Sequence, residues 1–294
     1  MELFQNSLQY LLSGISVGGQ YALIAIGYTM VYGILRLINF AHGDVFMVAG
    51  LMMVYISASM PMYIAIPLVI ILTVILGYAI EKAAYKPLRS APRMSVMISA
   101  IGVSYLLQNL ALYITGGLNQ NYPAIGWISD PITILGATTK RVTLITPILT
   151  IALVIALVLL INHTKIGMAM RAVSKDFETS CLMGIKINKV ISVTFIIGSL
   201  LAAVGSLLYF SNYPGVTPTA GSMPGLKAFV AAVFGGIGSI PGAVIGAFII
   251  GICENIIKGV GLSTFSDAFT FVLLIIILVV KPTGLFGEKT TDKV

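Results

Sequence analysis

Charged side chains are scarce in this chain of 294 residues. Asp, Glu, Lys and Arg together make up 9% of it, whereas soluble domains carry about 25%. Hydrophobic residues make up 58%, and the mean hydropathy is +1.02. These values exclude a soluble globular protein and predict an all-α polytopic membrane protein that lies in a lipid bilayer.

Cysteine and histidine are also sparse, with two of each. Cys181 and Cys253 cannot build a disulfide framework, and neither they nor His42 and His163 have the spacing of a metal site. The chain contains no G-x-x-x-x-G-K-[ST] phosphate loop and no H-E-x-x-H motif. We therefore expect no catalytic residue, no metal site and no cofactor in this chain.

Acidic residues are fewer than basic ones, and the formal net charge is +7. The positive residues gather in two loops, at 81–93 and 163–189, which the positive-inside rule places in the cytoplasm. Membrane topology explains the excess, so we expect no nucleic-acid partner. Near the apolar segments the acidic residues are Asp44, Glu254 and Asp267, all close to segment ends. This scarcity disfavours an ion-coupled carrier, which usually needs ionisable residues inside its helix bundle.

Long apolar segments fill the rest of the chain, and we predict eight to nine transmembrane segments that include short or broken helices. A stretch of a dozen residues spans roughly 18 Å as a helix, too short for a straight crossing of a ~30 Å core. The segment at 226–237 is of this length. The basic residues place the N-terminus outside and the C-terminus, with Lys281, Lys289 and Lys293, inside. The segments are residues 8–35, 44–60, 62–80, 96–116, 142–162, 190–211, 226–237, 241–257 and 264–280.

Two breaks interrupt the apolar pattern, RLINFAHGD at 36–44 and GGIGSIPG at 235–242. A charge at the bilayer centre costs at least ~2.5–3.5 kcal/mol, so we expect the first cluster near a surface or a wet cavity. It is either a capped helix start, which we favour for Asp44, or a broken helix that lines a path. Broken pieces in both halves, inserted with opposite orientation, predict an inverted repeat. The candidate path residues are Asn39, His42, Asp44, Gly235, Gly236 and Gly238.

The most polar long break is the loop at 163–189, HTKIGMAMRAVSKDFETSCLMGIKINK. We predict a short helix within it, with Ser174 as the N-cap and with Asp176 and Glu178 in the first turn. Gly184 then ends the helix with a positive φ. A helix of about nine residues is marginal alone in water. The segment is either a plain solvated loop or a helix that docks on a cytoplasmic partner.

Three stretches resemble one family of membrane proteins. They are residues 18–50 (GGQYALIAIGYTMVYGILRLINFAHGDVFMVAG), 167–209 and 235–251 (GGIGSIPGAVIGAFIIG). All three resemble the high-affinity branched-chain amino acid permeases of ATP-binding-cassette importers, of the LivH type. The resemblance therefore runs over nearly the whole chain.

A short motif within the central loop adds to this resemblance. Glu178-Thr179-Ser180-x3-Gly184 resembles the E-A-A-x3-G signature of importer permeases, with Thr and Ser in place of two alanines and no downstream I-x-L-P. The resemblance implies that residues 174–184 form a coupling helix, seated in a groove of an ATPase subunit. The implied coupling residues are Arg171, Ser174, Asp176, Phe177, Glu178 and Gly184.

The resemblance also implies a function. One permease domain would span 1–294, with 163–189 as its coupling loop, in the bacterial inner membrane. Its partners would be a second related permease, two cytoplasmic ATP-binding subunits and an external amino-acid-binding protein. ATP-driven alternating access would import leucine, isoleucine and valine, or alternatively other neutral amino acids or urea. Two alternative functions belong to other classes of protein. An ion-coupled carrier would work without ATPase subunits. An intramembrane enzyme would need a nucleophile paired with a base.

Overall fold

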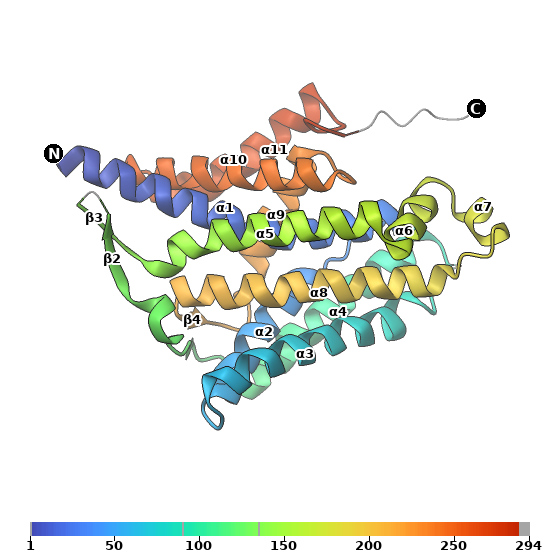
Figure 1. Cartoon of the computed structure of the whole chain (residues 1–294), viewed down its shortest axis with the longest axis horizontal. Coiled ribbons are helices and arrows are strands. Elements are labelled where there is room, and N and C mark those ends of the chain that lie inside the picture. Colours follow the sequence, from blue (N-terminus) through green and yellow to red (C-terminus); the bar gives the residue numbers. More distant parts are fainter. Residues whose placement is uncertain (1, 90, 135, 288–294) are drawn as a thin grey trace.

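The computed structural model describes residues 2–89, 91–134 and 136–287, and most of them form helices along one long axis (Figure 1). The longer helices are α1 (Glu2–Leu35), α3 (Met62–Ile80), α4 (Arg93–Thr115), α5 (Arg141–His163), α8 (Ile187–Asn212), α10 (Ile240–Gly259) and α11 (Ser266–Val280), which reaches 18 residues together with the turn at Ser263–Phe265. The shorter ones are α2 (His42–Ser57), α6 (Lys165–Lys175), α7 (Phe177–Leu182) and α9 (Ser222–Gly235).

Single turns and short strands complete the fold. A π-helical turn, η1 (Glu81–Tyr85), continues α3, and 3-10 turns form η2 (Gly126–Ser129) and η3 (Ser263–Phe265). β1 (Gln120–Asn121) pairs antiparallel with β4 (Gly215–Val216), and β2 (Pro131–Ile134) pairs antiparallel with β3 (Ala137–Lys140). The sequence patterns did not predict these strands.

Within the described residues, seven helices are long and apolar enough to cross a membrane. The apolar helices α2 and α9 are shorter, with 16 and 14 residues. At 1.5 Å per residue they reach roughly 24 and 21 Å, less than the ~30 Å of a bilayer core. The predicted all-α membrane fold is confirmed. The predicted total of eight or nine crossings stays a prediction, because length and composition alone do not decide what α2 and α9 span.

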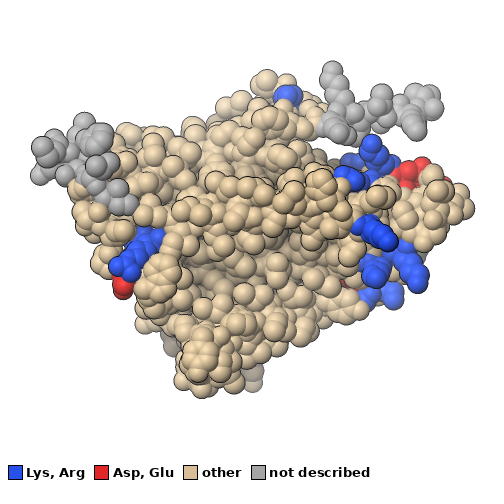
Figure 2. Space-filling model, in the orientation of Figure 1, with Lys and Arg blue, Asp and Glu red and all other residues tan. Residues whose placement is uncertain are grey.

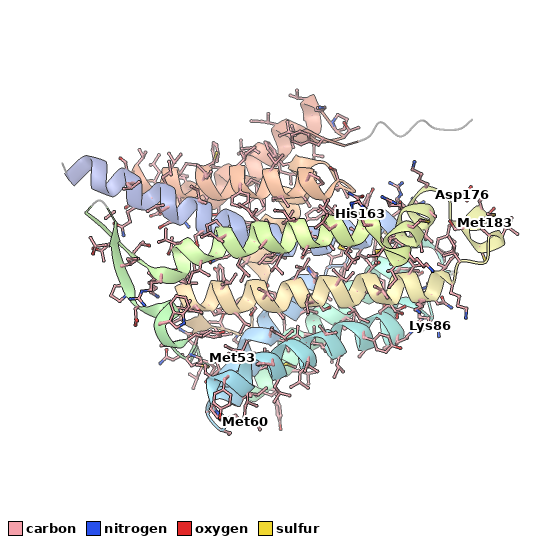
Figure 3. All side chains as sticks on the ribbon, viewed as in Figure 1. Met53, Met60, Lys86, His163, Asp176 and Met183 are labelled. Carbon is pink, nitrogen blue, oxygen red and sulfur yellow. The ribbon has the colours of Figure 1, made fainter. Side chains whose placement is uncertain are left out.

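Lys and Arg side chains gather at one end of the long axis, over α6 and α7 (Figure 2). We call this the basic end; it holds residues 81–89, 91–93 and 163–189. Lys86, His163, Asp176 and Met183 all lie there, whereas Met60 lies toward the other end (Figure 3). On the face shown, the surface between the two ends carries very few charged side chains, as contact with lipid requires (Figure 2). Lys289 and Lys293, which were used to predict the side of the C-terminus, lie outside the described residues.

Two basic residues at the opposite end have local partners. Lys140 donates through Nζ to the main-chain carbonyls of Ser211 (3.2 Å) and Asn212 (2.9 Å), at the end of α8. A cation is favourable at a helix C-terminus because it complements the helix dipole. Arg141 pairs with Asp130 at 3.4 Å. These contacts explain why two cations lie at the end away from the main basic cluster.

The loop predicted at 81–93 begins later than expected, because residues 81–85 are helical. α3 continues through η1 to Tyr85 because the Glu81 side chain is fully buried and must meet its partners inside the bundle. Glu81 pairs with Arg89 and accepts a hydrogen bond from Ser192 Oγ at 2.9 Å. Burial lowers the pKa of the Arg89 guanidinium, and the Glu81 carboxylate opposes that shift.

Close helix packing at glycine surrounds α1. A Cβ on Gly251 of α10 would lie 2.3 Å from the main-chain nitrogen of Gly18 in α1. The same crossing holds Gly14, as expected where helices pack closely through small residues in lipid. α1 thus lies in the centre of the bundle, between α10, α8 and α5.

The two halves of the chain repeat one pattern in opposite directions. In each, a long helix (α1 or α8) is followed by a non-helical break and a short helix (α2 or α9). α1 and α8 run in opposite directions along the long axis (Figure 1). The short helices meet at their N-termini, where a Cβ on Gly221 would lie 2.0 Å from the Gly43 carbonyl oxygen. This geometry agrees with the predicted inverted repeat.

This contact, which we call the junction (residues 42–44 and 221–225), lies deep in the bundle. A Cβ on Gly27 of α1 would lie 2.1 Å from His42 Nε2. Gly27 precedes the end of α1 at Leu35 by eight residues, which is roughly 12 Å along the helix. The chain therefore breaks near the middle of the apolar layer.

Candidate functional site

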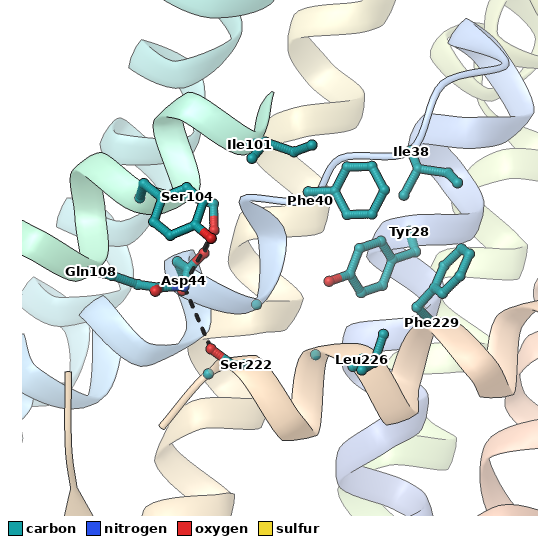
Figure 4. Close-up of a pocket in the computed structure, with 14 residues that line it drawn as sticks. Tyr28, Ile38, Phe40, Asp44, Ile101, Ser104, Gln108, Ser222, Leu226 and Phe229 are labelled. Atoms are coloured by element: carbon teal, nitrogen blue, oxygen red, sulfur yellow. Dashed lines mark hydrogen bonds between the residues drawn. The ribbon is translucent and has the colours of Figure 1, made fainter. Parts of the chain in front are cut away.

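A cavity of about 360 Å³ lies beside the junction (Figure 4). Its wall combines an apolar side with a polar one, as ligand pockets do. The apolar side comes from α1, the break at 36–41, α4 and α9, and consists of Tyr28, Ile38, Phe40, Ile101, Leu226 and Phe229. The polar side comes from α2, α4 and α9, and includes Asp44, Ser104, Gln108 and Ser222.

Asp44 supplies the carboxylate of the polar side. The N-terminus of α2 has no side-chain cap, so the favoured capping role of Asp44 is wrong. Its carboxylate instead accepts hydrogen bonds from Ser104 Oγ at 2.5 Å and Gln108 Nε2 at 3.0 Å, both on α4. Gln108 Nε2 also reaches Ser222 Oγ of α9 at 3.5 Å. Three of the helices around the cavity, α2, α4 and α9, thus share one hydrogen-bonded cluster (Figure 4).

Aromatic rings form the apolar side. Tyr28 and Phe229 meet edge to face, with centroids 5.9 Å apart. On its other side the Tyr28 ring meets the buried His42 ring at 5.1 Å. This packing holds Tyr28 in place between the junction and the cavity.

The other candidate path residues near α2 do not line this cavity. Asn39 is buried and accepts a hydrogen bond from Tyr85 Oη at 2.8 Å, which ties the break to η1. His42 is buried against Gly27, and its Nε2 has no hydrogen-bond partner among the described residues. Both residues therefore hold the break in place.

The candidate glycines of the second half lie at the turn between α9 and α10. A Cβ on Gly235 would lie 1.9 Å from the Gly242 carbonyl oxygen. Gly236 and Gly238 have φ values of +111° and +99°. These glycines allow a tight turn at the far end of α9, away from the cavity lining.

The central loop contains a helix that the sequence analysis missed. α6 occupies Lys165–Lys175 and begins at Thr164, whose side chain accepts a hydrogen bond from the Gly167 main chain at 3.1 Å. The signal for it was the spacing of Gly167, Met170 and Val173, which form its buried face. A separate contact anchors this helix to α5, since Arg171 donates to Asn162 Oδ1 at 2.9 Å.

The start of the predicted short helix is two residues too early. Ser174 lies in the last turn of α6, so its predicted role as an N-cap is wrong. The N-cap of α7 is Asp176, which accepts hydrogen bonds from the Thr179 main chain at 3.0 Å and from Thr179 Oγ1 at 2.6 Å. Because α6 extends to Lys175, α7 has six residues where about nine were predicted.

The end of α7 follows the prediction. Gly184 has a φ of +81°, and Ile185 donates to the Ser180 carbonyl at 3.1 Å, the hydrogen bond of a Schellman motif. Beside this turn Leu182 and Met183 are 87% and 78% exposed. Phe177 and Glu178 are exposed as well. α7 therefore presents apolar side chains at the basic end of the molecule.

One side chain links α6 to the break before α2. Arg36 donates through its guanidinium to the main-chain carbonyl of Ser174 at 3.3 Å. Arg36 has a φ of +55°, a conformation that is rare outside glycine. The segment that supports Asp44 is thus in contact with the helix that supports α7.

A buried ion network holds the start of α9. Lys227 Nζ lies 2.7 Å from Glu254 Oε1 and 2.6 Å from Asp267 Oδ1, while Lys258 also pairs with Glu254 at 2.6 Å. Tyr21 Oη donates to the second oxygen of Glu254 at 3.0 Å. Both acids were predicted at segment ends, but their cations were not predicted, although Glu254 and Lys258 have the i, i+4 spacing of a helical pair. Within the described residues no group of acidic, His or Cys side chains could hold a metal ion.

Short broken helices that meet beside a cavity, inside a bundle of apolar helices with one basic end, define a membrane transport permease. Residues 10–278 match the family model described as the permease component of branched-chain amino acid transport systems, and the chain belongs to this family. The resemblance found in the sequence is therefore confirmed.

Named relatives match over their full length. The chain is 39% identical to the high-affinity branched-chain amino acid transport system permease protein LivH of Salmonella typhimurium, with 100% of this chain and 99% of the relative covered. It is 38% identical to the corresponding protein BraD of Pseudomonas aeruginosa, with 98% of each covered. Among solved structures, PsaBC from Streptococcus pneumoniae in complex with Fab aligns with a TM-score of 0.43 at 13% identity, covering 97% of this chain and 94% of that chain.

Proposed function

We propose that this chain is the permease subunit of an ATP-driven importer that carries leucine, isoleucine and valine across the bacterial inner membrane. The observation that carries the proposal is the full-length sequence identity of 38–39% to the branched-chain amino acid permeases LivH and BraD. The whole chain acts as one permease domain, with the N-terminus outside and the C-terminus in the cytoplasm. A second related permease completes the membrane part of the importer.

The basic end faces the cytoplasm, and α7 docks in a groove of an ATP-binding subunit. Exposed Phe177, Leu182 and Met183 support this role, because a short helix with an exposed apolar face is marginal in water. ATP binding and hydrolysis take place on two separate chains. Their movement passes from α7 to α6, and through the contact between Arg36 and Ser174 to the break before α2.

Alternating access then arises at the junction. An external binding protein delivers the amino acid at the end that carries β2 and β3. Movement of α6 shifts the break at 36–41, and α2 with α9 opens the cavity to one side or the other. Each ligand acts through its different affinity for the two states.

Co-purification of the chain from detergent-solubilised native membranes tests the proposal. We expect two ATP-binding subunits and a second permease to accompany it. Replacement of Leu182 and Met183 by Gln should release the ATP-binding subunits, while Leu118→Gln, at another exposed site near the opposite end, should retain them. Radiolabelled leucine uptake into proteoliposomes, with unlabelled alanine or urea as competitors, then tests the cargo. Recovery of the chain alone or as a homo-oligomer, with uptake driven by an ion gradient, would contradict the proposal and support a carrier.

A further inference from the structure

We propose that the cavity binds the amino acid in transit, with Asp44 receiving the cargo's ammonium group and the apolar wall receiving its side chain. This inference rests on the proposed function, since it assigns the cargo a place within the permease. It makes the permease itself selective for a cationic amine.

The first support is a comparison of three buried carboxylates. Glu81 is paired with Arg89 and Lys82, and Glu254 with Lys227 and Lys258. Their exposed fractions are 0% and 2%, and that of Asp44 is also 2%. Among the described residues Asp44 alone of these three has no Lys, Arg or His within ion-pair distance, and no cationic side chain lines the cavity.

A buried charge without a counterion is unfavourable unless something compensates it. The neutral donors Ser104 and Gln108 and the partial positive charge of the α2 N-terminus stabilise the Asp44 carboxylate, but none of them neutralises it. The ammonium group of an amino acid would supply the missing positive charge. A charge-assisted hydrogen bond to Asp44 is the strongest interaction that this wall can offer a small ligand.

The rest of the wall matches the rest of an amino acid. Tyr28, Phe229 and Leu226 form a rigid apolar surface across from Asp44, suited to a branched aliphatic side chain (Figure 4). The start of α9, with the Ser222 hydroxyl, lies at the polar side and favours a carboxylate. The cavity volume of about 360 Å³ lies within the range of roughly 300–1,000 Å³ for small-molecule pockets.

Ligand protection of an introduced cysteine tests this assignment in the purified whole complex without its binding protein. Leu226→Cys places a thiol in the cavity wall, in a background with Cys181→Ser and Cys253→Ser. Labelling by a water-soluble maleimide is followed with leucine, with 3-methylbutylamine (the same side chain and an amine) and with 4-methylpentanoate (the same side chain and a carboxylate). A ligand at ten times its Kd should slow labelling about tenfold by mass action.

We expect leucine and 3-methylbutylamine to protect the thiol, and 4-methylpentanoate to leave its labelling unchanged. Asp44→Asn should weaken protection by both amines at least about tenfold, the factor expected for loss of a charge-assisted hydrogen bond. Leu118→Cys lies outside the cavity, so its thiol should be labelled at the same rate with and without each of the three ligands. Tyr105→Cys, which also lines the cavity, provides a second probe if Leu226→Cys does not yield an intact complex.

The experiment is run both without nucleotide and with a trapped ATP analogue. Equal protection by 4-methylpentanoate, no protection in either state, or protection that survives Asp44→Asn would overturn the inference. So would a cavity thiol that never labels. ATP-dependent leucine uptake by the same preparation separates the two proposals: uptake without protection removes the cavity assignment alone, and absence of ATP-binding subunits removes the importer itself.

Discussion

The junction of α2 and α9 and the pair of helices at the basic end are built in opposite ways. At the junction the main chains touch through Gly43 and Gly221, and Asp44 is 2% exposed. In α7 only Ser180 is buried, while Leu182 is 87% exposed. The junction is buried among the described residues, whereas α7 leaves most of its side chains exposed.

This difference predicts two kinds of variant. A substitution at the junction has to displace main chain or leave a charge unpaired inside the bundle, so it should affect folding and transport together. Side chains of α7 make few contacts with the rest of the chain. A substitution there should therefore affect coupling to the ATP-binding subunit and leave the fold intact. The following predictions test this separation, from the largest effect to the smallest.

Removal of one charge from the buried network at α9 should have the largest effect on stability. Glu254→Gln preserves the shape of the side chain but leaves the buried Lys227 with only Asp267 as its counterion. Breaking a buried ion pair costs about 3 kcal/mol or more. We expect a clear fall in the melting temperature of the detergent-solubilised protein.

Two matched variants sharpen this result. The double variant Lys227→Met with Glu254→Gln should recover part of the lost stability, because no buried cation is then left without its partner. Asp130→Asn removes an exposed partner of Arg141 and should change stability by less than about 1 kcal/mol. Equal losses for Glu254→Gln and Asp130→Asn would show that the network does not hold α9.

A side chain at the junction should have the next largest effect. In Gly221→Val the new Cβ would lie 2.0 Å from the Gly43 carbonyl oxygen, so the two helices must move apart. Overpacking of this kind costs about 1–3 kcal/mol. We expect a lower melting temperature and loss of leucine uptake. Gly102→Val in α4 is the control, since its Cβ would meet nothing within 4 Å. Normal uptake by Gly221→Val would mean that the close approach is not needed.

The residues of these two regions also show what a sequence can predict. Long apolar runs identify the membrane helices because each run is itself the cause of burial in lipid. Gly184 could be assigned because its positive φ follows from the local chemistry of a helix end. Such features depend on neighbours in the chain.

Other features depend on contacts between distant segments. The direction of the Asp44 carboxylate is set by Ser104 and Gln108, some sixty residues further along the chain. The pairing of Lys227 with Glu254 likewise requires two helices to pack side by side. Two features were missed despite a local signal: the pairing of Glu254 with Lys258, and α6, whose charges resembled those of a solvated loop.

A bulky residue at Gly184 should weaken the coupling between α7 and the ATP-binding subunits more than it lowers the stability of the helix bundle. Gly184→Val forces a β-branched residue into a φ of +81°, which strains the end of α7 by about 1–3 kcal/mol. We expect leucine uptake and uptake-linked ATP hydrolysis to fall together. The protein should still insert into the membrane, and the melting temperature of the helix bundle should not change. Gly116→Val is the matched control: it also has positive φ, at +62°, and open space, but it ends α4 away from α7. An equal loss of uptake in both variants would remove the special role of α7.

The contact that joins the two regions should show the smallest effect. Arg36→Ala removes the hydrogen bond to the Ser174 carbonyl, an exposed contact at 3.3 Å worth about 1 kcal/mol. If this contact carries movement from α6 to the break before α2, uptake per ATP hydrolysed should fall up to about fivefold. Stability should hardly change, because Arg36 is exposed.

A second variant distinguishes the lost contact from the backbone conformation. Arg36→Gly removes the same guanidinium but accommodates the φ of +55° without strain. If the contact matters, Arg36→Gly and Arg36→Ala should lower the uptake per ATP to the same extent, although Arg36→Gly should be the more stable of the two. Normal uptake per ATP in both would show that the junction and the basic end communicate by another route, since each variant lacks the guanidinium that now joins them.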